Sequence, residues 1–179
     1  LFPYTPLFRS ARFEQIIMIA PSPCWLDDPP YRGGYGPADI DGFLQLMDQN
    51  FIGWAAAISG RAGGTADGSA YLDASLRRGD PSTVARLARL VFHSDVRALL
   101  PDVAVPVTII DAESDGLVPR TAVDYMVAQL PDATLSRLPL VGHLPHLTAP
   151  AEVARAIEAA LGHAHGEGAS GGARSEERR

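Results

Sequence analysis

Two side chains capable of acid–base chemistry follow apolar runs in the last third of the chain. Asp115 follows VPVTII within the acidic segment DAESD, and His143 ends the run LPLVGH. An imidazole can accept a proton near neutral pH, and a carboxylate beside it fixes its tautomer and stabilises the imidazolium that forms. These residues are therefore candidates for the orienting acid and the general base of a hydrolytic enzyme.

The identity of the acid stays open on position alone. Asp111 stands at the end of the same apolar run, and Glu113 lies between Asp111 and Asp115. Position favours Asp115 without excluding the other two. His143 also has a simpler interpretation, in which it caps a strand end and takes no part in catalysis.

Neither a metal site nor a cofactor site is expected from the motifs. His143 and His146 form an H-x-x-H pair, but zinc would need further ligands, and Pro145 between them argues against a helical pair. The segment RGGYG lacks G-x-G-x-x-G spacing, so we interpret it as a loop that enters a helical block.

Short apolar runs alternate with helix signals, which predicts an α/β fold with a parallel sheet. The strands are expected at residues 15–20, 105–110 and 133–143. Ligands of open α/β sheets bind beyond the carboxyl ends of the strands, which is where Asp115 and His143 would lie. An acid followed by a histidine in such positions is the second half of the Ser…Asp…His order of α/β-hydrolases.

Four helices are expected between the first two strands. Apolar positions from Ile40 to Ile58 continue past Asn50, a weaker signal covers about residues 68–77, and Asp80 before a proline marks the start of the last helix. Two more helices should follow the later strands, the second of them turning Val153, Ile157 and Leu161 inward and stopping at Gly162.

Composition excludes several classes of protein. A chain of 179 residues fits one domain, and its net charge of −6 forms no basic stripe, which argues against nucleic-acid binding and a membrane anchor. No run is long enough to span a bilayer and nothing resembles a signal peptide, so we expect a cytoplasmic protein. Cys24 has no neighbouring histidine and is expected to be a small buried hydrophobe.

Five ordered motifs resemble one branch of the α/β-hydrolases, the bacterial RsbQ-type stress-response hydrolases, to which plant strigolactone and karrikin receptors also belong. The motifs are IIMIAPSPCWLDDPPYRGGY, FIGWA, GDPSTVARLARLVFHSD, VPVTIIDAESDGLVP and GHLPHL. The resemblance covers about residues 13–161. It implies a Ser-His-Asp hydrolase with Asp115 and His143 at the triad positions, and a V-shaped lid of four helices over an apolar pocket.

The resemblance divides the chain into parts of an incomplete hydrolase. These are residues 11–37 as strand and loop of the core, 38–100 as the lid, 101–162 as the C-terminal core and 163–179 as a disordered tail. In the lid, aromatic side chains would line the pocket or, alternatively, pack between helices; they are Phe43, Phe51, Trp54 and Phe92.

The nucleophilic serine is expected outside this sequence. None of the eleven serines lies in a G-x-S-x-G elbow, and Ser69 in DGSAY, which comes closest, lacks the second glycine and a preceding strand. In the family the elbow precedes the first strand, so we expect it, together with the oxyanion-hole loop, to be encoded upstream of residue 1. The chain is then the C-terminal half of an enzyme.

The two ends are expected to lie outside the fold. LFPYTPLFRS resembles the translation of a common sequencing adapter, LFPYTTLFRS, with one difference at Pro6, which suggests that native protein begins near Ala11; the alternative is a natural proline-rich arm. The tail has no large apolar residue, so His163 and His165 are expected to be solvated.

These observations predict a hydrolase of a small apolar ester or lactone, with His143 as base and Asp115 as its orienter. The rival prediction is a ligand receptor of the same fold, which senses a molecule through the lid and signals to a protein partner with little turnover. Bacterial relatives of this branch assist a stress-signalling phosphatase, so the resemblance also implies a signalling protein as partner.

Overall fold

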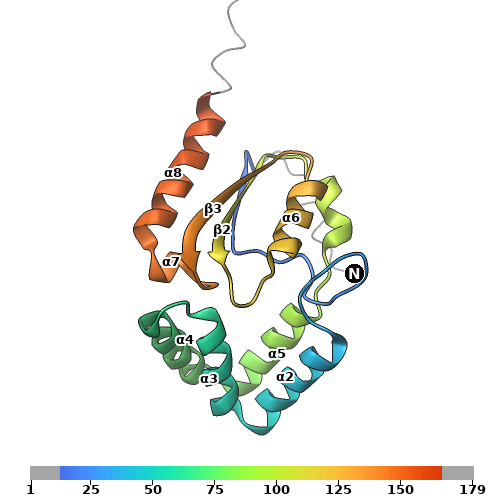
Figure 1. Cartoon of the computed structure of the whole chain (residues 1–179), viewed down its shortest axis with the longest axis vertical. Coiled ribbons are helices and arrows are strands. Elements are labelled where there is room, and N and C mark those ends of the chain that lie inside the picture. The colour runs from blue at the N-terminus through green and yellow to red at the C-terminus, as the bar shows by residue number, and fades with distance from the viewer. Residues whose placement is uncertain (1–12, 167–179) are drawn as a thin grey trace, which may run out of the picture.

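A computed structural model describes residues 13–166 of the chain (Figure 1). The expectations for the first ten residues, for residues 167–179 and for the side chains of His163 and His165 fall outside what it describes. The elements in chain order are β1 (Ile16–Ile19), α2 (Pro37–Gln49), α3 (Phe51–Ala62), α4 (Ala66–Arg78), α5 (Pro81–Phe92), the 3-10 helix η1 (Arg97–Asp102), β2 (Val107–Ser114), α6 (Arg120–Gln129), β3 (Ala133–Val141), α7 (Pro145–Thr148) and α8 (Pro150–Gly166).

The three expected strands form a parallel sheet in the order β1-β2-β3. Successive side chains of β2 pack on opposite faces of the sheet, because neighbouring residues of a strand point to opposite sides. Val107 and Ile109 belong to the main apolar core together with residues of α6. Ile110 and Ala112 are buried on the other face of β2, and α8 also contacts β2. The expected α/β fold is confirmed.

Two strands differ from the expectation. The strand β2 runs four residues past Ile110 to Ser114, so the expected acidic loop begins later. It stays paired because Asp111 lies opposite Arg137 of β3 and binds its guanidinium, which satisfies a charge inside the sheet. The side chains of β1 are only half-buried, because β1 is an edge strand of the described sheet.

Helices α2 to α5 form a block below the carboxyl ends of the strands (Figure 1), which confirms the four expected helices. The apolar stripe from Ile40 to Ile58 belongs to two helices, because the side chain of Asn50 accepts a hydrogen bond from the Gly53 amide at 2.9 Å and caps α3. Asp80 caps α5 as expected, accepting from the Thr83 amide at 2.8 Å.

The last helix is longer than expected. It continues to Gly166, four residues beyond the predicted stop at Gly162. Val153 is buried and Ile157 half-buried, but Leu161 is 43% exposed, which corrects its expected inward orientation. In the last described turns the buried stripe passes through Ala160 instead, so Leu161 lies at its border.

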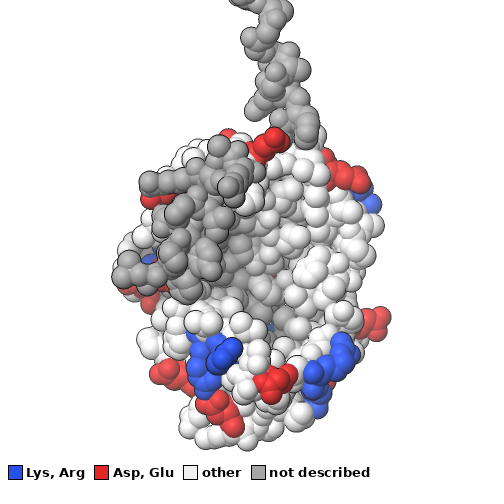
Figure 2. Space-filling model, turned by 180° about the vertical axis from the view of Figure 1, so that it is seen from behind, with Lys and Arg blue, Asp and Glu red and all other residues white. Residues whose placement is uncertain are grey.

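Charges are mixed on the face of the molecule seen in Figure 2. Arginine and acidic side chains alternate around the helical block, and no continuous basic stripe forms on this face. Within residues 13–166, none of the helices has the length and apolar character needed to cross a bilayer.

The helical block and the end of β3 meet in a close backbone contact. Gly64, in the turn between α3 and α4, has a φ of +67° and lies against Gly142 and the Val141 carbonyl, where a Cβ atom would come within 2.0 Å of the carbonyl oxygen. The His143 amide donates to the Ala62 carbonyl across the same contact at 2.8 Å. We call these residues, 62–64 and 141–143, the glycine seam.

Gly64→Ala should destabilise the chain by about 2 to 4 kcal/mol, because the new Cβ meets backbone and the φ is positive. Gly60→Ala is the matched control in α3, where a Cβ would meet nothing within 4 Å; it should stabilise by about 0.5 to 1 kcal/mol. Urea unfolding of both variants measures the difference. Equal free energies of unfolding for the two variants would show that the glycine seam accommodates a methyl group without loss of stability.

Candidate active site

Asp115 is held by the loop that follows β2. Its Oδ1 atom accepts hydrogen bonds from the amides of Leu117 at 2.7 Å and Val118 at 3.1 Å, and its side chain is 2% exposed. The side chain of an aspartate readily accepts amides two and three residues ahead, which explains why this residue type suits the turn. The other oxygen, Oδ2, is left to face a neighbour.

That neighbour is His143. Its Nδ1 atom lies 2.8 Å from Asp115 Oδ2, and its side chain is 20% exposed. The residue is placed by Gly142, which has a φ of +106° and donates its amide to the Ser114 carbonyl at 2.8 Å. Trp25 packs edge-on against the imidazole, with ring centres 6.2 Å apart. With Nδ1 engaged, Nε2 is the nitrogen available for proton exchange.

The electrostatics of Asp115 favour its charged form. Burial raises the pKa of this carboxyl, but the hydrogen bond and charge of His143 and the two amide donors outweigh burial, so the pKa lies below its ordinary value. A carboxylate that stays ionised beside an imidazole can orient it and stabilise its protonated form.

The structure separates Asp115 from the competing residues. Asp111 is buried and bound to Arg137, which also binds Asp124 of α6, and burial raises the pKa of Asp111. Glu113 is exposed at the end of β2. His146 is exposed on α7, so the two histidines of the H-x-x-H pair do not form a common metal site. Within the described part of the chain, no three His, Cys, Asp or Glu side chains are grouped to hold a metal ion.

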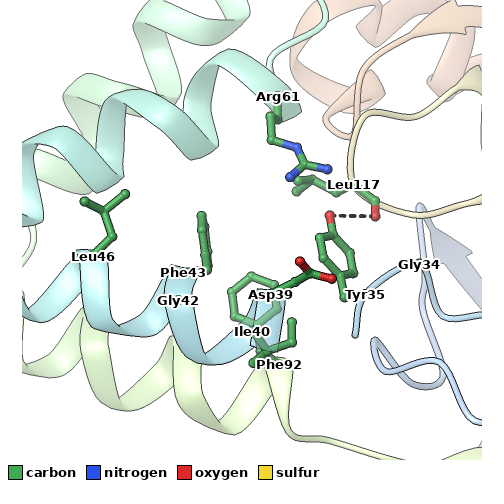
Figure 3. Close-up of a pocket in the computed structure, with 10 residues that line it drawn as sticks. All are labelled: Gly34, Tyr35, Asp39, Ile40, Gly42, Phe43, Leu46, Arg61, Phe92 and Leu117. Carbon is green, nitrogen blue, oxygen red and sulfur yellow. Dashed lines mark hydrogen bonds between the residues drawn. The ribbon is translucent and has the colours of Figure 1, made fainter. Parts of the chain in front are cut away.

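An apolar hollow of about 340 Å³ adjoins His143. Two of the four aromatic residues expected to line a pocket, Trp54 and Phe92, are among its walls. Phe43 and Phe92 line a second hollow of about 470 Å³ (Figure 3). Phe51 lines neither of these hollows and stacks on Trp54, with ring centres 5.7 Å apart, an arrangement of the kind that the packing alternative describes.

Sequence reasoning missed several lining residues, namely Trp25, Tyr35, Arg61, Leu117 and Leu144. Leu117 carried a signal, since it stands two residues after Asp115. Trp25 also carried one, because it lies in the loop after β1, at the carboxyl end of the sheet. The positions of the others depend on how the helical block docks, which the local sequence does not indicate.

The remaining candidates take no part in this site. Cys24 is buried as expected, and burial raises the pKa of its thiol. Ser69 lies near the start of α4 and not between a strand and a helix. Among residues 13–166, none of the serine hydroxyls is hydrogen-bonded to His143.

Comparison with known proteins gives a consistent family. A profile of the alpha/beta hydrolase family matches residues 6–156. The strigolactone esterase D14 of Arabidopsis thaliana is 33% identical over 156 residues, which are 86% of this chain and 58% of that protein. The karrikin insensitive 2 receptor CA of Petunia hybrida is 31% identical over 161 residues, 88% of this chain and 58% of the receptor.

A solved structure shares the fold. A hydrolase from Oleispira antarctica superposes with a TM-score of 0.80 at 30% sequence identity, over 84% of this chain and 56% of that one. The chain thus spans between 56% and 58% of the length of these three proteins.

Asp115→Asn should flatten the loss of stability on acidification. Because the pKa of Asp115 is lowered in the folded chain, its ionised form stabilises the fold above the unfolded pKa, and this contribution disappears as the pH falls through the folded pKa. Urea unfolding between about pH 5 and about pH 2 should therefore show a steeper fall for the wild type. The exposed Asp41→Asn serves as control and should keep the wild-type slope. If the unfolding free energies of Asp115→Asn and the wild type fell with pH along parallel slopes, the lowered pKa of Asp115 would be contradicted.

Proposed function

The chain belongs to the alpha/beta hydrolase family, and on that premise we propose that Asp115 and His143 are the acid and base of a serine-dependent hydrolase. The substrate class is a small, largely apolar ester or lactone. One observation carries the proposal: His143 faces a buried, ionised carboxylate through Nδ1 at 2.8 Å and lines an apolar hollow. In this arrangement Nε2 can accept the proton of a nucleophile that lies beside an apolar binding surface.

The chemistry follows from that geometry. His143 Nε2 takes the proton of a serine hydroxyl as the serine oxygen attacks the carbonyl carbon, and the imidazolium is stabilised by Asp115. The imidazolium then donates this proton to the departing alkoxide, which leaves an acyl-enzyme. Water, deprotonated by the same nitrogen, releases the acid and restores the serine.

The serine belongs, in this proposal, to the part of the relatives' length that the chain does not span. A G-x-S-x-G turn between a strand and a helix would present its oxygen at the carboxyl edge of the sheet. That is the edge at which Asp115 and His143 stand, directly after β2 and β3. No cofactor is needed for this reaction.

Helices α2 to α5 act as a lid in the proposed enzyme. They lie beyond the carboxyl ends of the strands (Figure 1), and their apolar side chains supply most of the wall of the hollow next to His143. A cover of this kind excludes water, which strengthens the electrostatic pairing beneath it. The resemblance of the ordered motifs to RsbQ-type hydrolases supports the proposal of a bacterial stress-signalling role.

A receptor is the second candidate, and one observation favours it. The glycine seam bonds the amide of His143 to the Ala62 carbonyl of the lid at 2.8 Å, so a ligand that moves the lid also acts on the site. One relative is a karrikin insensitive 2 receptor. Turnover by a full-length protein, compared with its ligand-dependent affinity for a signalling protein, separates the candidates: fast turnover without a ligand effect on partner binding excludes the receptor.

In a full-length protein that carries this chain, His143→Ala should lower kcat for model esters on the order of a thousandfold or more. His146→Ala is the matched control, since its exposed ring lies outside the Asp115 pair, and it should retain most of the activity. Hydrolysis of a chromogenic short-chain ester measures both. Equal losses in the two variants would refute the roles given to these histidines.

A further inference from the structure

We propose that the hollow of Figure 3 binds a small molecule with an apolar body and a single carboxylate, and that Arg61 recognises that carboxylate. Arg61 is then a specificity-determining residue. The inference deepens the proposed function, on which it rests for the reaction, while the binding step can be measured separately.

The hollow has the size and the lining of a small-molecule site. Its volume of about 470 Å³ lies within the range that such sites occupy. Most of its wall is apolar, contributed by Tyr35, Ile40, Phe43, Leu46, Phe92 and Leu117. In Figure 3, Phe43 and Leu46 of α2 face Arg61 and Tyr35 across the hollow.

Arg61 brings the positive charge to this apolar surface. It lies in the last turn of α3, and its Cζ atom stands 5.4 Å from the centre of the Tyr35 ring. Within residues 13–166 it forms no ion pair with a carboxylate, whereas six other arginines do, namely Arg32, Arg77, Arg89, Arg97, Arg137 and Arg155. Its charge is therefore not neutralised by a carboxylate of the described chain, and Tyr35 is the side chain that contacts its guanidinium.

The position of Arg61 is fixed beside the candidate active site. A Cβ atom at Gly116, the residue after Asp115, would lie 2.0 Å from the Arg61 carbonyl oxygen, so the two backbones touch. The hydroxyl of Tyr35 donates to the Leu117 carbonyl at 3.1 Å, which holds the ring on which the guanidinium lies (Figure 3). The backbone of Arg61 is thus placed by packing, and its exposed side chain reaches the hollow beside Tyr35.

The charge balance points to a carboxylate and not to a phosphate. A guanidinium presents two parallel N–H donors, which match the two oxygens of a carboxylate. The hollow also contains Asp39, whose Oδ2 accepts the Gly36 amide at 2.8 Å. Because these two charges nearly cancel, the hollow offers little net attraction to offset the larger desolvation cost of a dianion, which favours a monoanion.

Titration of the 179-residue chain with 3-phenylpropanoate and with the neutral 3-phenylpropanamide tests the proposal. Tryptophan fluorescence reports binding, because Trp54 lies 5.6 Å from Phe43, measured between ring centres. The acid should bind more tightly than the amide. Arg61→Gln should weaken binding of the acid by about tenfold or more and leave the amide unchanged, as expected for loss of a charge-assisted hydrogen bond.

Two further variants complete the test. Arg61→Lys keeps a charge without the planar fork and should recover part of the affinity. Arg86→Gln, an exposed arginine of α5 outside the hollow, should bind like the wild type. Thermal melting of each variant checks that it folds.

Three outcomes would overturn the inference. They are unchanged affinity for the acid in Arg61→Gln, tighter binding of the amide than of the acid by the wild type, and tighter binding of phenyl phosphate than of 3-phenylpropanoate. Absence of ester hydrolysis in the full-length protein, with carboxylate binding intact, would instead refute the proposed function alone.

Discussion

Close backbone contact at the glycine seam is the constraint on which the site depends. The turn after α3 and the turn after β3 approach so closely that neither Gly64 nor Gly142 has room for a side chain. This approach allows the His143 amide to reach the Ala62 carbonyl and holds the helical block against the sheet. The seam therefore sets the position of the His143 imidazole relative to the helical block whose side chains line the hollow beside it.

Two aspartates close together in sequence show how surroundings assign a role. Asp111 lies within the sheet, where burial raises the pKa of its carboxyl and Arg137 compensates its charge across the strands. Asp115, although its side chain is just as buried, receives two amides and an imidazole, and its pKa is lowered. The number of donors aimed at each group, more than burial, separates a structural ion pair from an acid that can serve catalysis.

Local sequence signals accounted for much of the fold. Apolar runs located the strands, Asp80 marked a helix start, and the ends of two strands brought Asp115 to His143. Features that depend on contacts between distant segments escaped sequence reasoning. The length of β2 depends on a charge pair with β3, and the approach of Arg61 to Tyr35 depends on the docking of α3. The resemblance to RsbQ-type hydrolases favoured Asp115 over the neighbouring acids, a choice that local position left open.

Leu117 and Phe92 line both hollows, so these two side chains form a partition between adjoining chambers. The bulk of a partition limits the length of any molecule that either chamber can hold. In the proposed hydrolase, smaller residues at these positions would merge the chambers and make room for elongated acyl chains, with Asp115 and His143 unchanged. Changes at these two positions alone would then alter the preferred substrate length of the proposed hydrolase. A library of variants at Leu117 and Phe92, screened with esters of increasing length, should show a shift in preferred chain length. An unchanged preference would show that other residues set the limit.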